Sequence, residues 1–233
     1  MLAFWTDGLA ETCDSADGPV GSVIHFIEEK LKGPVSHSNH AVRAIRAAIA
    51  IIDRVRLTRE ADEARKERGF TIKIGINSGP TLIGNVGSGN HFSYSIMGKE
   101  VNFASRLEGV PPLYGCNIVL GENTARLARI EFLLRELDWI LVKDGDKPMT
   151  IYEPIAELGQ ANETKRKLVT GFSLALEHYR AARFPEACSI WDDLVAKYEP
   201  APSPSSVMAA RTRDLMTHPP TQPWNAVTVL KSK

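Results

Sequence analysis

Two hydrophobic patterns follow one another in the first half of the chain. Between residues 40 and 68 apolar side chains recur at helical spacing, and Gly69 can end this helix. Between residues 70 and 77 apolar and polar positions alternate, which predicts a half-buried strand. The apolar stripe of the helix consists of Val42, Ile45, Ile49 and Ile52, and that of the strand consists of Ile72, Ile74 and Ile76.

Shorter elements with turn residues between them continue to about residue 157. The predicted elements are a strand at 1–5, a hairpin at 81–97, a helix at 100–110, a strand at 117–120, a helix at 122–130 and a closing strand pair at 139–143 and 149–153. Strands that alternate with helices and hairpins are typical of an α+β sandwich. We therefore treat residues 1–157 as one α+β domain, in which residues 6–38 form an irregular loop or short helix.

From residue 158 to residue 233 the pattern predicts a small helical appendage. Residues 165–183 and 185–198 predict two amphipathic helices that resemble one tetratricopeptide-type hairpin. One such hairpin buries too little apolar surface to stand alone, so we expect it to pack on the preceding domain or on a partner. A Pro/Ser-rich hinge at 199–206, a short helix at 207–216 and a Pro-rich tail near Trp224 complete the chain.

Charge and cysteine content exclude several classes of protein. The chain has 28 Lys and Arg residues against 28 Asp and Glu residues, so its formal net charge of +0 draws it neither to nucleic acid nor to anionic lipid. The three cysteines lack the paired spacing of a zinc or disulfide framework. No apolar run is long enough to span a bilayer, and residues 1–5 lack the length and basic flank of a signal peptide. We therefore expect a cytoplasmic chain that makes no membrane contact of its own.

The most informative chemistry lies in the helix predicted at residues 100–110. Asn102 and Arg106 are four residues apart, so their side chains point the same way from successive turns. An amide can hold a sugar oxygen and a guanidinium can hold a phosphate, which is what a phosphoryl-transfer site requires. On spacing alone, this evidence is weak, because an Asn and an Arg four residues apart more often form an ordinary surface pair.

Six sequence segments, taken in their order along the chain, favour the phosphoryl-transfer site over the surface pair. They are residues 72–80 (IKIGINSGP), 84–88 (GNVGS), 94–109 (YSIMGKEVNFASRLEG), 114–120 (YGCNIVL), 135–143 (RELDWILVK) and 150–153 (TIYE). Together they resemble the second half of the catalytic domain of class III nucleotidyl cyclases, the adenylate and guanylate cyclases. The resemblance implies a ferredoxin-like cyclase core that lacks its first strands and helices.

The resemblance also implies roles for four residues. Arg106 would steady charge on the transferring phosphate, Asn102 would orient the ribose, and Lys143 would meet the terminal phosphates. Ser95 falls where the family reads the purine, and its hydroxyl fits adenine without excluding guanine. Ser95 as a plain strand residue and Lys143 as a solvated turn lysine beside Asp144 remain the alternatives.

Divalent metal is a further expectation from the resemblance. The family uses Mg²⁺ or Mn²⁺ held by two Asp residues, and both of these residues would precede Met1 of this chain. Asp7, Asp14 and Asp17 follow the strand predicted at residues 1–5 and lie in the inserted segment, so they do not restore the pattern and no metal ligand is assigned.

These implications lead to an expected function. The chain would belong to the adenylate cyclases, which convert ATP to cyclic AMP and pyrophosphate, with GTP a less favoured substrate. It would act as a homodimer or as a heterodimer with a complete cyclase subunit, and on its own it would be inactive as a truncated chain. The alternatives are a non-catalytic regulatory or nucleotide-binding partner of another cyclase, and an α+β interaction module in which Asn102 and Arg106 are only structural.

Overall fold

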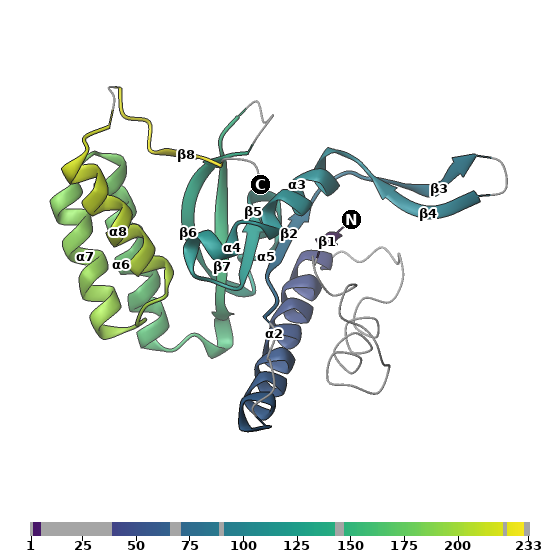
Figure 1. Ribbon diagram of the computed structural model, residues 1–233, viewed down its shortest axis with the longest axis horizontal. Helices are drawn as coiled ribbons and strands as arrows, with labels where there is room; N and C mark the ends of the chain where they lie inside the picture. Colours follow the sequence, from purple (N-terminus) through teal and green to yellow (C-terminus); the bar gives the residue numbers. More distant parts are fainter. Residues whose placement is uncertain are drawn as a thin grey trace.

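A six-stranded mixed sheet forms the centre of the chain (Figure 1). The computed structural model describes residues 2–5, 39–65, 71–88, 91–142, 147–220 and 223–230. The strand order is β1-β2-β5-β7-β6-β8; the pairs β2 with β5 and β6 with β8 are parallel, and the other neighbours are antiparallel. The strands span Leu2–Trp5 (β1), Ile74–Ser78 (β2), Ile118–Gly121 (β5), Phe132–Leu141 (β6), Met149–Glu157 (β7) and Val227–Val229 (β8).

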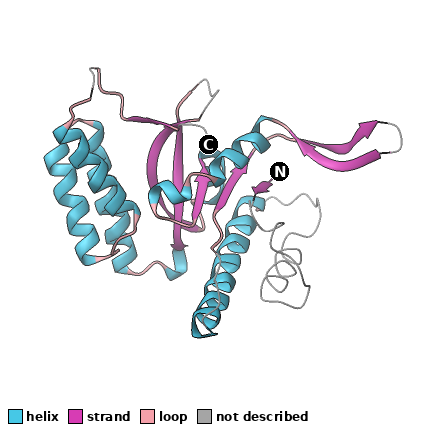
Figure 2. Cartoon of the chain, in the orientation of Figure 1, coloured by secondary structure: helices cyan, strands magenta, loops and turns pink. Residues whose placement is uncertain are grey.

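Strands β3 (Leu82–Ser88) and β4 (His91–Met97) form a separate antiparallel hairpin that projects away from the sheet (Figure 2). The hairpin predicted at residues 81–97 is thereby confirmed. Strand β4 leads directly into helix α3 (Lys99–Glu108), so the arm and this helix form one continuous segment.

One face of the sheet is covered by α2 (His40–Arg65) and α5 (Glu122–Ala128). The predicted stripe of α2 is confirmed at Val42 and Ile45, which pack with Ile74 and Ile76 of β2 in one apolar cluster, called here the α2 cluster. All five residues of β2 are buried, so the expectation of a half-buried strand was wrong. The second face of β2 is covered by α3, which the strand pattern alone could not show.

The other face carries α3, α4 (Pro111–Tyr114), α6 (Glu163–Arg180), α7 (Phe184–Lys197) and α8 (Pro204–Thr217), and the short 3-10 helix η1 (Leu158–Gln160) follows β7. A second apolar cluster, called here the α3–α8 cluster, joins Leu107 of α3 and Val119 of β5 to Trp191 of α7 and Met208 of α8. Val119 faces this cluster, whereas its neighbours in β5 face the α2 cluster. The C-terminal helices therefore pack directly on the sheet.

The closing strand β6 begins at Phe132, seven residues before its predicted start. Arg135 and Asp138 interrupt the apolar pattern, yet they are 2% and 1% exposed. Arg135 pairs with Glu153 and Glu199, and Asp138 pairs with Arg211, so both charges are compensated inside the protein. Strand β8 was not predicted, because its backbone bonds to β6 depend on a partner 88 residues earlier, as the pairing of Trp139 with Val227 shows.

The Pro/Ser-rich segment expected to be a hinge is packed. Ser203 is 5% exposed and Ser205 is fully buried. Ser203 caps α8 by accepting a hydrogen bond from the N–H of Ser206, whose hydroxyl accepts one from the N–H of Ser203. Helix α8 therefore begins at Pro204 and not at residue 207.

Residues 6–38, predicted as an inserted loop or helix, lie outside the described residues. Within the part of the chain that the structure describes, none of the helices has the length and apolar character required to cross a bilayer.

Candidate functional site

Helix α3 presents Asn102 and Arg106 on its exposed face. Phe103, Ala104 and Leu107 are buried on the opposite side, which fixes the rotation of the helix. A spacing of four residues separates the two Cα atoms by about 6 Å along the helix axis. An amide and a guanidinium thus stand side by side on a surface that a phosphorylated sugar could reach.

The start of α3 is set by Gly98. Its φ of +146° lies in a backbone region that favours glycine. The Gly98 carbonyl accepts hydrogen bonds from the N–H groups of Val101 at 3.1 Å and Asn102 at 3.2 Å. This turn converts the outgoing strand β4 into a helix within one residue. The position of Asn102 is therefore fixed from the first turn of α3.

Hydrogen bonds from a buried asparagine also hold α3 to β2. Asn77, 1% exposed, donates through Nδ2 to the Glu100 carboxylate at 2.8 Å and to the Glu100 carbonyl at 3.2 Å. Neither residue has a role predicted from the sequence. The available signal was a polar side chain inside an apolar strand, which needs a partner when buried.

Gly75 allows α3 to lie against β2. A Cβ at this position would be 2.5 Å from the backbone nitrogen of Glu108 and 2.6 Å from the carbonyl carbon of Leu107. Neither backbone atom can move without the helix. We expect Gly75→Ala to lower the free energy of unfolding by about 1–3 kcal/mol, which urea denaturation would measure.

The matched control is Gly159→Ala. No atom lies within 4 Å of a Cβ at Gly159. That change should alter stability by less than about 0.5 kcal/mol. Equal stability of the two variants would contradict the close packing of α3 on β2.

The structure describes the other two predicted site residues only in part. The backbone of Ser95 lies in β4 opposite Gly84, three residues before the turn into α3, and its side chain lies outside the described residues. Lys143 also lies outside them, directly after Val142, the residue that follows β6. The structure brings Asn102 and Arg106 together and leaves the roles of Ser95 and Lys143 as predictions.

The described side chains do not form a metal site. Among the described residues, no three His, Cys, Asp or Glu side chains gather closely enough to hold a metal ion. Asp7, Asp14 and Asp17 lie in residues 6–38. The described side chains therefore do not fit the pair of divalent ions expected from the family resemblance.

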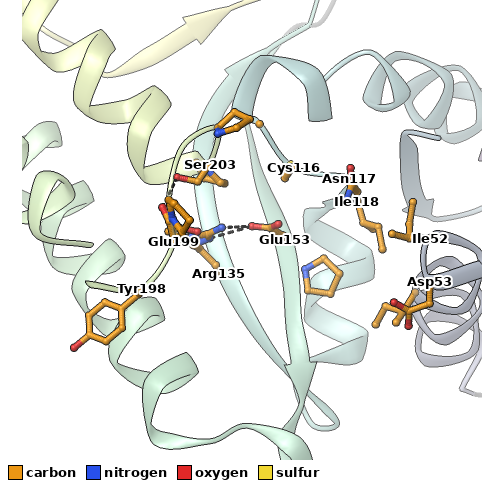
Figure 3. A pocket seen from close by; sticks show the side chains of 16 residues that line it. Ile52, Asp53, Cys116, Asn117, Ile118, Arg135, Glu153, Tyr198, Glu199 and Ser203 are labelled. Atoms are coloured by element: carbon orange, nitrogen blue, oxygen red, sulfur yellow. Dashed lines mark hydrogen bonds and ion pairs between the residues drawn. The ribbon is translucent and has the colours of Figure 1, made fainter. Parts of the chain in front are cut away.

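A cavity of about 480 Å³ lies between α2, the sheet and the segment that joins α7 to α8 (Figure 3). Inside it the Arg135 guanidinium donates to Glu153 at 3.1 Å and to Glu199 at 2.6 Å. Burial raises the pKa of the Glu153 carboxyl, and the nearby Arg135 opposes this rise. None of the described residues that line the cavity belongs to α3, so the cavity is separate from the exposed face of that helix.

Sequence comparisons identify relatives of the chain. The family model for the adenylate and guanylate cyclase catalytic domain matches residues 27–153. The chain is 28% identical over 169 residues to adenylate cyclase 1 of Rhizobium meliloti (strain 1021), a match that covers 71% of this chain and 25% of the relative. It is 34% identical over 162 residues to the adenylate cyclase of Anabaena cylindrica, covering 66% of this chain and 32% of the relative. The chain thus spans a third or less of the length of these curated relatives.

The fold agrees with these matches. The crystal structure of the adenylyl cyclase CyaB from P. aeruginosa is similar with a TM-score of 0.54 at 21% identity, covering 66% of this chain and 92% of that chain. This likeness confirms the expected α+β class III cyclase fold. Since the family model also spans more than half of the residues, the chain belongs to the family of adenylate and guanylate cyclase catalytic domains.

Proposed function

We propose that this chain supplies Asn102 and Arg106 to a nucleotide-cyclising site shared with a second cyclase subunit. The observation that carries the proposal is the exposed pair on α3, a helix fixed on β2 by Gly75 and by the bond from Asn77 to Glu100. A rigid support of this kind keeps a binding group within the small tolerance that catalysis allows.

The reaction would form a bond between the ribose 3′ oxygen and the α-phosphorus of the same nucleotide. The bond from that phosphorus to the oxygen bridging it to the β-phosphate breaks, pyrophosphate leaves, and the proton of the 3′ hydroxyl passes to solvent. Arg106 stabilises the negative charge that builds up on the α-phosphate oxygens, and Asn102 holds the ribose for in-line attack. The described side chains of this chain offer no divalent-metal site, so any metal that the reaction needs would have to be held by residues of the partner subunit.

The preferred substrate would be ATP. The Ser95 hydroxyl, which can donate or accept, suits the adenine amino group, and the two curated relatives described above are named adenylate cyclases. Lys143 would contact the terminal phosphates. The complemented site should therefore form cyclic AMP faster than cyclic GMP at equal nucleotide concentration.

The test mixes this chain with an intact cyclase from which the equivalent arginine has been removed. We expect metal-dependent cyclic AMP formation to return on mixing, because the chain offers Arg106 across the interface, whereas the chain alone should form none. If the chain instead stimulates an unaltered cyclase but does not rescue the arginine-deficient one, it is a regulatory partner and the proposed role of Arg106 is wrong.

A further inference from the structure

We infer that helix α8 positions α3, and with it Asn102 and Arg106, through a contact set centred on the buried side chain of Asp138. This set, called here the Asp138 hub, consists of Asp138, Tyr114, Arg211 and Thr228. Its residues come from β6, α4, α8 and β8, which are far apart in the sequence. Two of the four, Arg211 and Thr228, lie beyond the 27–153 range of the family match.

The Asp138 carboxylate bonds to every other member of the hub. Oδ2 of Asp138, which is 1% exposed, accepts hydrogen bonds from the Tyr114 hydroxyl at 2.5 Å, the Arg211 guanidinium at 2.6 Å and the Thr228 hydroxyl at 2.7 Å. The other oxygen accepts from the N–H of Trp139 at 2.8 Å. The pair is costly to disrupt, because removing Arg211, whose side chain is 24% exposed, would leave the buried Asp138 charge in a low-dielectric interior.

Helix α8 also contacts α4 directly. The Arg211 guanidinium carbon lies 5.1 Å from the centre of the Tyr114 ring. Next to Tyr114, Gly115 has a φ of +66°, and a Cβ there would be only 3.0 Å from the backbone nitrogen of Ser203, the N-cap of α8. Helix α4 is thus held by both the first turn and the middle of α8.

Helix α4 in turn is joined to α3 with almost no intervening chain. Val110, which is fully buried, follows α3 after one residue, and its N–H donates to the Leu107 carbonyl at 3.1 Å. Leu107, Val110 and Tyr114 pack in the α3–α8 cluster with Met208 of α8. A shift of α8 therefore reaches α3 through packed side chains and one short turn, whereas α2 belongs to the other cluster.

This connection makes Tyr114, Asp138 and Arg211 positioning residues for α3. The connection itself depends only on the packing described above. Its catalytic consequence rests on the proposed function of Asn102 and Arg106.

Amide hydrogen exchange of the full chain tests the connection. Arg211→Met removes the charge and keeps most of the stem, so we expect the exchange of the α3 amides to accelerate about tenfold more than that of the α2 amides. The matched control is Arg213→Met on the same helix, because Arg213 is 55% exposed and pairs with Asp192 at the surface. The control should change neither helix.

Equal acceleration in α2 and α3 would mean a plain loss of global stability and would overturn the inference, as would unchanged exchange in α3. Arg211→Lys restores a charge toward Asp138 without the guanidinium fork, and it should recover part of the protection of α3. In a site completed by a partner cyclase, Arg211→Met should lower kcat and leave KM unchanged. Failure of this kinetic result alone would count against the proposed function and leave the connection between α8 and α3 intact.

Discussion

Replacing Arg106 by Ala in a site completed by a partner cyclase should lower kcat about 10²–10³-fold, the usual cost of removing one group that stabilises charge developing in a transition state. The reason is that a guanidinium neutralises charge on the α-phosphate as the leaving group departs. The measurement is the rate of cyclic AMP formation by the mixed proteins at saturating ATP. Asn102→Ala should have a smaller effect, because a neutral amide orients the ribose without neutralising charge.

The matched control for this experiment is Arg126→Ala. Arg126 is also an exposed arginine in the last turn of a helix, but it lies on α5, which packs with α2. Its loss should leave the rate within about twofold of the unaltered mixture, since surface charges far from a site act only through screened fields. A similar loss of activity in both variants would show that Arg106 acts through general charge and not through contact with the nucleotide.

The largest expected effect on stability comes from Asp138→Ala. This change leaves the Arg211 guanidinium without its carboxylate and removes the acceptor of the buried Tyr114 hydroxyl. We expect the free energy of unfolding to fall by about 3–5 kcal/mol, the range found when one partner of a buried ion pair is deleted. Urea denaturation followed by circular dichroism measures it.

Asp192→Ala is the control for the stability experiment. Asp192 pairs with Arg213, but its side chain is 48% exposed, so solvent screens the pair. Its loss should cost less than about 1 kcal/mol. Equal costs for the two aspartates would contradict the assignment of Asp138 as the centre of the contact between the sheet and the C-terminal helices.

Much of the fold follows from local patterns. Helix α2, the hairpin β3–β4 and helix α3 each lie within a few residues of their predicted bounds, because their apolar spacing and flanking glycines act within one element. Gly98 and Gly109 frame α3 in this way.

The errors occur where distant segments meet. The charged residues Arg135 and Asp138 led to a predicted β6 that is too short. A buried charge in a strand is stable only when an oppositely charged residue pairs with it, and here Glu199 and Arg211 supply these pairs from distant parts of the chain. The segment at 199–206 was predicted to be a hinge because the contacts that hold it also come from distant parts of the chain. Its Glu199 and Ser205 are held in place by the sheet and by the start of α8.

The site itself could be predicted only in part. The shared face of Asn102 and Arg106 follows from helical periodicity, whereas the role of Glu100 depends on a contact with Asn77 in another element. Ser95 and Lys143 remain predictions from family resemblance.

We propose that this chain provides the Asn102 and Arg106 half of a shared cyclase site. The most direct measurement compares its effect on two altered forms of one intact cyclase, one without its transition-state arginine and one without its metal-binding aspartates. We expect the chain to restore cyclic AMP formation to the arginine-deficient form and not to the aspartate-deficient form. Rescue of the aspartate-deficient form, or of neither form, would contradict this proposal.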